Sequence, residues 1–346
     1  MRFVLGVFAL ALAFWSGGCA PASLPKLPPA AAGTLYVVNE DSDDLSVIDA
    51  ATDSVLATVK IGHAPSGVAV SPDGKFIYVT LGEEGQVAVL DAGTNQVIAA
   101  IPVGKDPQAI VVSRDGQSGY VTNYESNDIT ILDLQARKSL TSVPVGTNPQ
   151  AIAMAAAGDV VYAVNLRSNS VTVLDATSGK VRDTIPAGEG PSGIALTADG
   201  RYAYVGGHGA SGGMGAMKGM EGSGKEGAVK SGPNKDVRVL DLNTKQIAGT
   251  IVCGTMPTAI VLSPDAKGYV VNHGSNDMSV VDLASRGIIS TIPVGKNPSA
   301  LVLSEDGRRV YVANRDSNDV SVVDTVSLKV VATIPVGQGP RSLALK

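Results

Sequence analysis

The 346-residue sequence predicts an all-β fold, a seven-bladed β-propeller with four antiparallel strands in each blade. Two periodic features carry this prediction. Seven tyrosines recur with gaps of 42, 42, 42, 42, 65 and 42 residues: Tyr36, Tyr78, Tyr120, Tyr162, Tyr204, Tyr269 and Tyr311. A Gly-x-x-Pro motif closes every unit, with its glycine at Gly62, Gly104, Gly146, Gly188, Gly254, Gly295 and Gly337. A fixed period of this length is typical of repeat architectures.

The composition excludes several classes of protein. Hydrophobic residues make up 44% of the chain, enough to bury a core. The net charge of −5 argues against a dedicated nucleic-acid binder, which usually carries a basic surface. Two cysteines cannot form a disulfide framework, and the sequence contains no CxxC, CxxCH or HExxH motif.

Each unit contains four short β patterns divided by turn residues. In the first unit they cover 35–38, 45–49, 55–61 and 66–71, and they are rich in Val, Ile and Tyr. An aspartate such as Asp49 or Asp91 closes the second of these patterns, the third strand of a blade, where its carboxylate is expected to accept backbone N–H groups of the following turn. Four strands in about 42 residues, repeated seven times, match the blade size and blade number of a seven-bladed propeller.

Small residues identify the strand after each Gly-x-x-Pro as the innermost one, because space is short near a propeller axis. The second residue after each proline is small: Gly67, Ala109, Ala151, Gly193, Ala259, Ala300 and Ser342. The chain therefore begins at the second strand of a blade, and residues 341–346 are expected to supply the missing inner strand and close the ring. This closure removes a free sheet edge. The Gly-x-x-Pro loops and the Ser-Asn turns then share one face, which surrounds the channel mouth.

The repeat carries Tyr120-Val121-Thr122-Asn123 and its variants, Ser-Pro-Asp-Gly at 71–74, and Ile-Pro-Val-Gly ending at Gly337. In these motifs the sequence resembles the YVTN family of β-propellers over residues 33–346. The resemblance implies the seven-bladed scaffold but no single chemistry, because the members of this family share a fold rather than an activity.

The N-terminal residues predict export. Residues 1–18 form a signal peptide whose apolar run, 3–15, is short for a membrane span. Ser16-Gly17-Gly18-Cys19 resembles a bacterial lipobox, which implies lipidation at Cys19; cleavage at 20–22 by an ordinary signal peptidase is the alternative. The Pro/Ala-rich residues 19–32 are interpreted as a tether to the propeller at 33–346.

A ring of polar residues at the channel mouth is the candidate ligand site. The residue directly after each Gly-x-x-Pro proline faces the mouth on the predicted topology: Ser66, Gln108, Gln150, Ser192, Thr258, Ser299 and Arg341. The set is mostly uncharged with one cation, which suits a small anionic or hydroxylated ligand. Solvated loop residues without a ligand are the alternative interpretation.

The fifth unit carries an insertion of 24 residues, at about 206–236, that is rich in glycine and methionine. Thioether and imidazole groups suit Cu(I), so copper is the one cofactor that the sequence suggests. The candidate ligands are His208, Met214, Met217, Met220, Met256 and His273. Cys253, Met278 and His63 are expected on the same face. A Gly-rich linker with incidental methionines is the alternative.

The leading hypothesis is an exported, non-enzymatic cell-envelope propeller that binds a protein or small-molecule partner at the channel mouth. It predicts a monomer in the periplasm, at the outer membrane or at the cell surface, with membrane contact only through a lipid anchor. Copper binding is the second hypothesis. A propeller hydrolase such as a lactonase, with His63 and His273 meeting across the mouth, is the third. No catalytic residue is assigned, because no nucleophile is paired with a histidine in the motifs.

Overall fold

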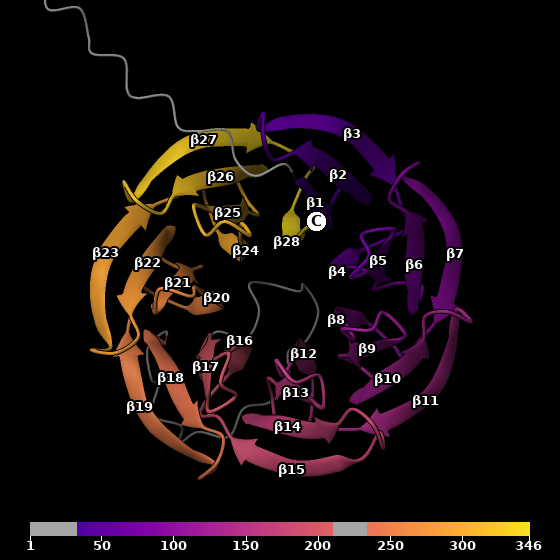
Figure 1. Cartoon of the computed structure of the whole chain (residues 1–346), viewed down its shortest axis with the longest axis horizontal. Coiled ribbons are helices and arrows are strands. Elements are labelled where there is room, and N and C mark those ends of the chain that lie inside the picture. Colours follow the sequence, from indigo (N-terminus) through magenta and orange to yellow (C-terminus); the bar gives the residue numbers. More distant parts are fainter. Residues whose placement is uncertain (1–32, 210–233) are drawn as a thin grey trace, which may run out of the picture.

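The computed structural model describes residues 33–209 and 234–346, which form seven four-stranded antiparallel sheets in a ring (Figure 1). In these two ranges every regular element is a strand, and no helix could cross a membrane. The predicted signal peptide, Cys19 and the tether lie outside the described residues, as do Met214, Met217 and Met220.

Each blade places its strands in chain order from the axis outward, apart from the blade that contains both chain ends. The innermost strands are β4 (Pro65–Val70), β8 (Pro107–Val112), β12 (Pro149–Met154), β16 (Pro191–Leu196), β20 (Pro257–Leu262), β24 (Pro298–Leu303) and β28 (Pro340–Leu345). The second strands are β1 (Thr34–Asn39), β5 (Phe76–Leu81), β9 (Ser118–Asn123), β13 (Val160–Asn165), β17 (Tyr202–Gly207), β21 (Lys267–Asn272) and β25 (Arg309–Asn314).

Two further strands complete each blade. The third strands are β2 (Asp44–Asp49), β6 (Gln86–Asp91), β10 (Asp128–Asp133), β14 (Ser170–Asp175), β18 (Asp236–Asp241), β22 (Asp277–Asp282) and β26 (Asp319–Asp324). The outer strands are β3 (Ser54–Lys60), β7 (Gln96–Pro102), β11 (Lys138–Pro144), β15 (Val181–Pro186), β19 (Gln246–Val252), β23 (Gly287–Pro293) and β27 (Lys329–Pro335). The prediction of seven blades with four strands is confirmed.

The C-terminal strand closes the ring as predicted. The first blade has the strand order β28-β1-β2-β3, and β28 pairs antiparallel with β1, with Tyr36 opposite Ala344. In Figure 1 β28 takes its place beside the other innermost strands around the axis. One sheet is therefore built from both ends of the chain, and neither β1 nor β28 is left with a free edge inside the ring.

The core lies between neighbouring blades. The seven repeated tyrosines are at most 8% exposed, and aliphatic residues of adjacent second and third strands pack around them. The hydroxyls of Tyr120 and Tyr311 donate to backbone carbonyls, Tyr120 Oη to Ala176 O at 2.9 Å and Tyr311 Oη to Ala50 O at 3.3 Å. The repeated aspartates hold turns as expected: Asp91 Oδ1 accepts the N–H of Thr94 at 2.8 Å.

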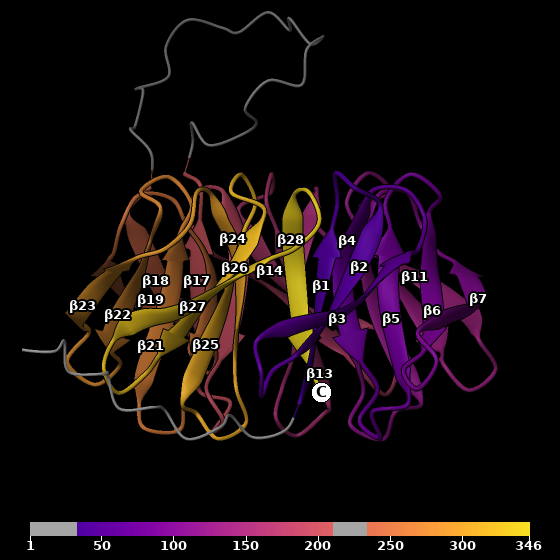
Figure 2. The same cartoon turned by 90° about the horizontal axis from the view of Figure 1, so that it is seen from above.

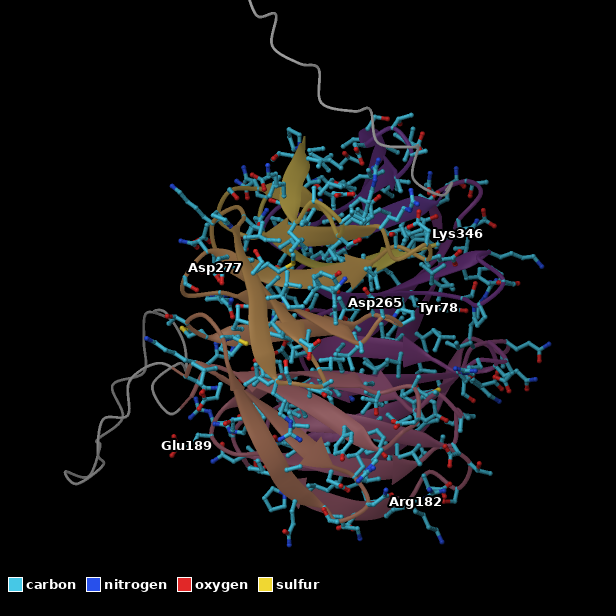
Figure 3. The ribbon with its side chains drawn as sticks, turned by 60° about the vertical axis from the view of Figure 1, so that its left-hand side comes forward. Tyr78, Arg182, Glu189, Asp265, Asp277 and Lys346 are labelled. Carbon is cyan, nitrogen blue, oxygen red and sulfur yellow. The ribbon has the colours of Figure 1, made fainter. Side chains whose placement is uncertain are left out.

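The two faces of the ring carry different loops. Every innermost strand starts at the face with the Gly-x-x-Pro loops, here called the Gly-x-x-Pro face, and Figure 2 shows β28 running from it to the C-terminus on the opposite face. In Figure 3, Glu189 of a Gly-x-x-Pro loop and Asp277 at the start of β22 lie along one edge, while Lys346 lies away from them. The predicted assignment of the loops to faces is confirmed.

A buried asparagine joins each of five blades to its incoming Gly-x-x-Pro loop. Asn165, at the end of β13, donates through Nδ2 to Ser170 Oγ at 3.1 Å and to Thr172 Oγ1 at 2.9 Å. The glycine of the loop lies directly on the amide, since a Cβ at Gly146 would be 2.6 Å from Asn165 Cγ. The same contact recurs between Asn39 and Gly337, Asn123 and Gly104, Asn272 and Gly254, and Asn314 and Gly295.

Replacing Gly146 by alanine is expected to destabilise the propeller by about 1–3 kcal/mol, because the added methyl overpacks a buried contact. Gly93→Ala is the matched control. Its Cβ would approach nothing closer than Asp91 Oδ1 at 3.3 Å, in an exposed turn, and its effect should stay within about 0.5 kcal/mol. Urea unfolding of the two variants measures the difference. Equal midpoints would show that the Gly–Asn contact does not constrain the blades.

Candidate binding site at the Gly-x-x-Pro face

The predicted polar residues form a ring on the innermost strands, here called the inner ring. Each directly follows the proline that begins its strand, and neighbouring innermost strands contact one another all round the axis. The inner ring consists of Ser66, Gln108, Gln150, Ser192, Thr258, Ser299 and Arg341. Ser66, Ser192 and Thr258 are buried, and the other four are partly exposed. The structure therefore brings all seven together, three of them beneath the surface.

Close approach of backbones explains the small residues of the innermost strands. A Cβ at Gly67 would lie 2.6 Å from Gln108 O on the next innermost strand, and a Cβ at Gly193 would collide with Thr258 O. The crowding predicted near the axis is confirmed, and its cause is contact between neighbouring strands.

The inner ring is hydrogen-bonded where the chain ends meet. Arg341 donates to Glu40 Oε1 at 2.5 Å and also to Gln108 Oε1, while Gln108 Nε2 donates to Asp106 Oδ1 at 2.5 Å. Ser299 Oγ donates to Pro340 O of the neighbouring innermost strand at 2.9 Å. The one cation of the inner ring is thus already engaged by a carboxylate and an amide oxygen.

Glu40 is the centre of an ion-pair cluster that sequence reasoning missed. Its carboxylate accepts from Arg341 of β28 in its own blade and from Arg315 of the preceding blade, which also pairs with Asp41 at 2.9 Å. Burial opposes ionisation of this carboxyl, but the two guanidinium groups outweigh burial and lower the pKa of Glu40. The cluster ties the C-terminal strand to both blades at the closure.

Glu40 and Arg315 belong to a second ring, here called the turn ring. Its members lie four residues after each repeated tyrosine, just past the end of the second strand: Glu40, Gly82, Tyr124, Leu166, His208, His273 and Arg315. Aligning the seven units at this position would have revealed it. Four consecutive blades supply His208, His273, Arg315 and Glu40, so the acidic and basic members occupy one arc.

Three buried oxygens of the inner ring have no hydrogen-bond partner. They are Gln150 Oε1, Ser192 Oγ and Thr258 Oγ1, on the consecutive innermost strands β12, β16 and β20. The repeated asparagines also have an unpartnered Oδ1, but the same atom recurs in all five blades that carry them: Asn39, Asn123, Asn165, Asn272 and Asn314. That recurrence belongs to the scaffold, whereas the three inner-ring oxygens are confined to one arc.

Two of the predicted metal ligands lie side by side. The rings of His208 and His273 meet edge to face with centroids 5.9 Å apart, and His208 Nδ1 is buried without a partner. Burial, reinforced by the neighbouring ring, lowers the pKa of His208 to about 4. Burial also lowers the pKa of His273, so both rings are neutral at pH 7.

Met256 lies in the Gly-x-x-Pro loop beside this pair. Its carbonyl accepts the N–H of His273 at 3.0 Å, and its Sδ is 3.3 Å from the place of a Cβ at Gly274. Its φ of 56° is left-handed, a conformation that the equivalent position in other blades gives mostly to Asn, Asp or Gly. The structure thus brings Met256 next to the His273–Gly274 segment.

Other soft side chains expected on this face do not join the pair. The prediction that Met278 is exposed on this face is wrong, because its side chain is fully buried in the core beside Val271 and Ile292. Cys253 packs against the core, where burial raises the pKa of its thiol to about 12. His63 pairs with Asp43 at 3.0 Å, and the imidazole beside His273 is that of His208.

A groove of about 550 Å³ lies elsewhere, between β11 and the strands β14 and β15 of the next blade. No titratable side chain lines it, so it offers no acid or base for catalysis. Its walls are Pro144, Val145, Gly146, Ser168, Asn169, Ser170, Thr172, Val181, Thr184 and Pro186.

Replacing Glu40 by glutamine is expected to lower the free energy of unfolding by about 1.5–3 kcal/mol at pH 7, since two charge-assisted hydrogen bonds weaken. The folded pKa lies below the ordinary 4.5, so this stabilisation is complete above that value and is lost as the pH falls through the folded pKa. Urea unfolding at pH 7 and pH 3 measures both effects. The control Glu125→Gln, at an exposed position on the same face, should leave the free energy of unfolding unchanged. If the difference between Glu40→Gln and wild type were as large at pH 3 as at pH 7, the stabilising role of the Glu40 ion pairs would be contradicted.

The three histidines are expected to titrate separately in imidazole NMR spectra. The hydrogen bond to Asp43 raises the pKa of His63 above 6.5, while His208 should titrate near 4 and His273 below 6.5. Single His→Gln variants assign the signals. Three superimposed curves near 6.5 would rule out the buried histidine pair.

Comparison with known proteins gives the same fold. Hydrazine synthase from Kuenenia stuttgartiensis matches 91% of this chain and 99% of its own, with a TM-score of 0.75 and 22% identity. A functionally unknown protein from Desulfotomaculum acetoxidans matches 90% and 98%, with a TM-score of 0.72 and 14% identity. Dihydro-heme d1 dehydrogenase NirN in complex with DHE matches 94% and 78%, with a TM-score of 0.63 and 19% identity. These likenesses show the fold alone.

Sequence comparison identifies the family. A stretch of 40 residues is 50% identical to the PE-PGRS family protein PE_PGRS18 of Mycobacterium tuberculosis, but it covers only 12% of this chain and 9% of that protein. The model of the YNCE-like β-propeller family matches residues 17–203 and 232–345, which is most of the chain. The protein therefore belongs to the YNCE-like β-propeller family.

Proposed function

We propose that this protein is a cell-envelope binding module whose Gly-x-x-Pro face holds a small hydroxyl-rich molecule against the inner ring. The observation that carries the proposal is the arc of three buried, unpartnered oxygens on β12, β16 and β20. A buried polar atom without a partner costs about 1–3 kcal/mol, so a ligand that donates hydrogen bonds to this arc recovers that energy.

The chemistry of the arc selects the class of ligand. Gln150 Oε1 only accepts hydrogen bonds, and the hydroxyls of Ser192 and Thr258 both donate and accept. Hydroxyl groups complement this set, because each can donate to one oxygen and accept from another. An anion fits less well, since the guanidinium of Arg341 is already engaged by Glu40 and Gln108.

Variation among otherwise repeated positions also supports a binding role. The tyrosines, the aspartates and the Gly-x-x-Pro motifs recur because every blade needs them. The turn ring instead contains acidic, basic, aromatic, aliphatic and glycine members at equivalent places. Glu40 and Arg315 pair at the ring closure, but the sevenfold scaffold does not require the differences among the other five members, which would suit recognition of one asymmetric ligand.

The envelope location rests on the sequence. The apolar run at 3–15 and the lipobox-like segment ending at Cys19 support export, with anchoring through lipid at that cysteine. A module tethered in this way would present its binding face outside the cytoplasm.

Titration calorimetry of the full chain with neutral polyols and monosaccharides, myo-inositol and D-glucose first, tests the proposal. Thr258→Val removes one hydroxyl of the arc at constant shape and is expected to weaken binding about 3- to 10-fold. Without ligand, this variant should be at least as stable as wild type, because it removes an unpartnered buried group.

Ser299→Ala is the matched control, since its hydroxyl belongs to the same ring but is bonded to Pro340 O. It should lose some stability and keep its affinity for the polyol. Sodium acetate and phosphate serve as anionic probes. Binding of the anions without the polyols, or equal loss of affinity in both variants, would contradict the proposed site.

A further inference from the structure

We infer that His208, His273 and Met256 form a Cu(I) site on the Gly-x-x-Pro face, separate from the inner ring. Two imidazole rings with centroids 5.9 Å apart and an adjacent thioether are the donor set that this soft ion prefers. The inference goes beyond the proposed binding of a polyol and does not depend on it.

Backbone hydrogen bonds fix the three residues relative to one another. The N–H of His208 donates to Gly190 O at 2.9 Å, and the N–H of His273 donates to Met256 O at 3.0 Å. The N–H of Met256 donates in turn to Asn234 O at 2.7 Å, and the N–H of Asn234 donates to His208 O at 3.3 Å. The donor side chains therefore come from a rigid part of two adjacent blades, as a preorganised metal site requires.

The scaffold does not account for this arrangement. His208 Nδ1 is buried and has no partner, whereas a structural histidine normally bonds through its ring nitrogens. Met256 occupies a left-handed position where five of the other six blades have Asn, Asp or Gly. Gly274 leaves room for its Sδ, since a Cβ there would be only 3.3 Å away. A ligand shared by these groups gives each of them a role.

The donor chemistry favours copper in its reduced state. In the described ranges no group of three or more His, Cys, Asp or Glu side chains could hold a metal ion, which disfavours a zinc site built from four such ligands. Cu(I) accepts low coordination by imidazole and thioether groups.

Anaerobic competition of the full chain with the Cu(I) chelator bicinchoninate measures the site. Wild type is expected to bind one Cu(I) through these residues, and His208→Ala and His273→Ala should each weaken that binding at least 100-fold. Met256→Leu keeps the side-chain size, removes the sulfur and should weaken binding about 10-fold or more. X-ray absorption of the loaded protein should show two nitrogen donors and one sulfur donor.

His63→Ala is the matched control, because it removes a histidine of the same face that is paired with Asp43. It should leave copper binding unchanged. The same holds for Cys253→Ala and for a triple leucine variant at Met214, Met217 and Met220. Thermal melts of the metal-free variants establish whether each one folds. If a histidine variant does not fold, Met256→Leu still tests the site. Wild-type affinity in a folded His208→Ala/His273→Ala variant, or loss of tight binding in the triple leucine variant, would overturn the inference.

Discussion

The contact between a buried asparagine and an incoming glycine is the constraint on which the ring depends. The amide nitrogen of Asn123 ties the end of β9 to Asp128 and Thr130 of β10, and Gly104 of the incoming loop lies against the same amide. One side chain thus sets the turn within its blade and the entry of the chain from the preceding blade. Since this contact repeats around the ring, the angle between blades repeats with it.

Two blades depart from this rule and use other means. Where Leu81 replaces the asparagine, Glu84 accepts the N–H of His63 at 2.9 Å and holds the incoming loop. Where Gly207 replaces it, the side chain of Arg238 lies against Gly188 and donates to Glu189 O at 3.2 Å. The geometry of the loop is preserved, but the residues around it are free to differ.

The periodicity of the sequence was enough to predict the blades, the order of the strands, the two faces and the closure by residues 341–346. Each of these follows from a short-range pattern that is repeated many times. The ion-pair cluster of Glu40 could not be predicted, because its partners Arg315 and Arg341 are 275 and 301 positions away and have no counterpart in other units. The inner ring was located from the repeat, but which of its hydroxyls lack partners depends on fractions of an ångström between neighbouring strands.

The departure at Gly207 also places the histidine pair. A Cβ at this position would collide with Gly190 O, so glycine lets the incoming loop approach the end of β17 more closely. The next residue, His208, then donates its N–H to that same carbonyl at 2.9 Å. An asparagine here would restore the contact of the other blades and displace the loop that positions His208. The blade therefore lacks the asparagine–glycine contact at the point where its own histidine meets the histidine of the next blade. The same glycine that replaces the asparagine thus positions one residue of the histidine pair.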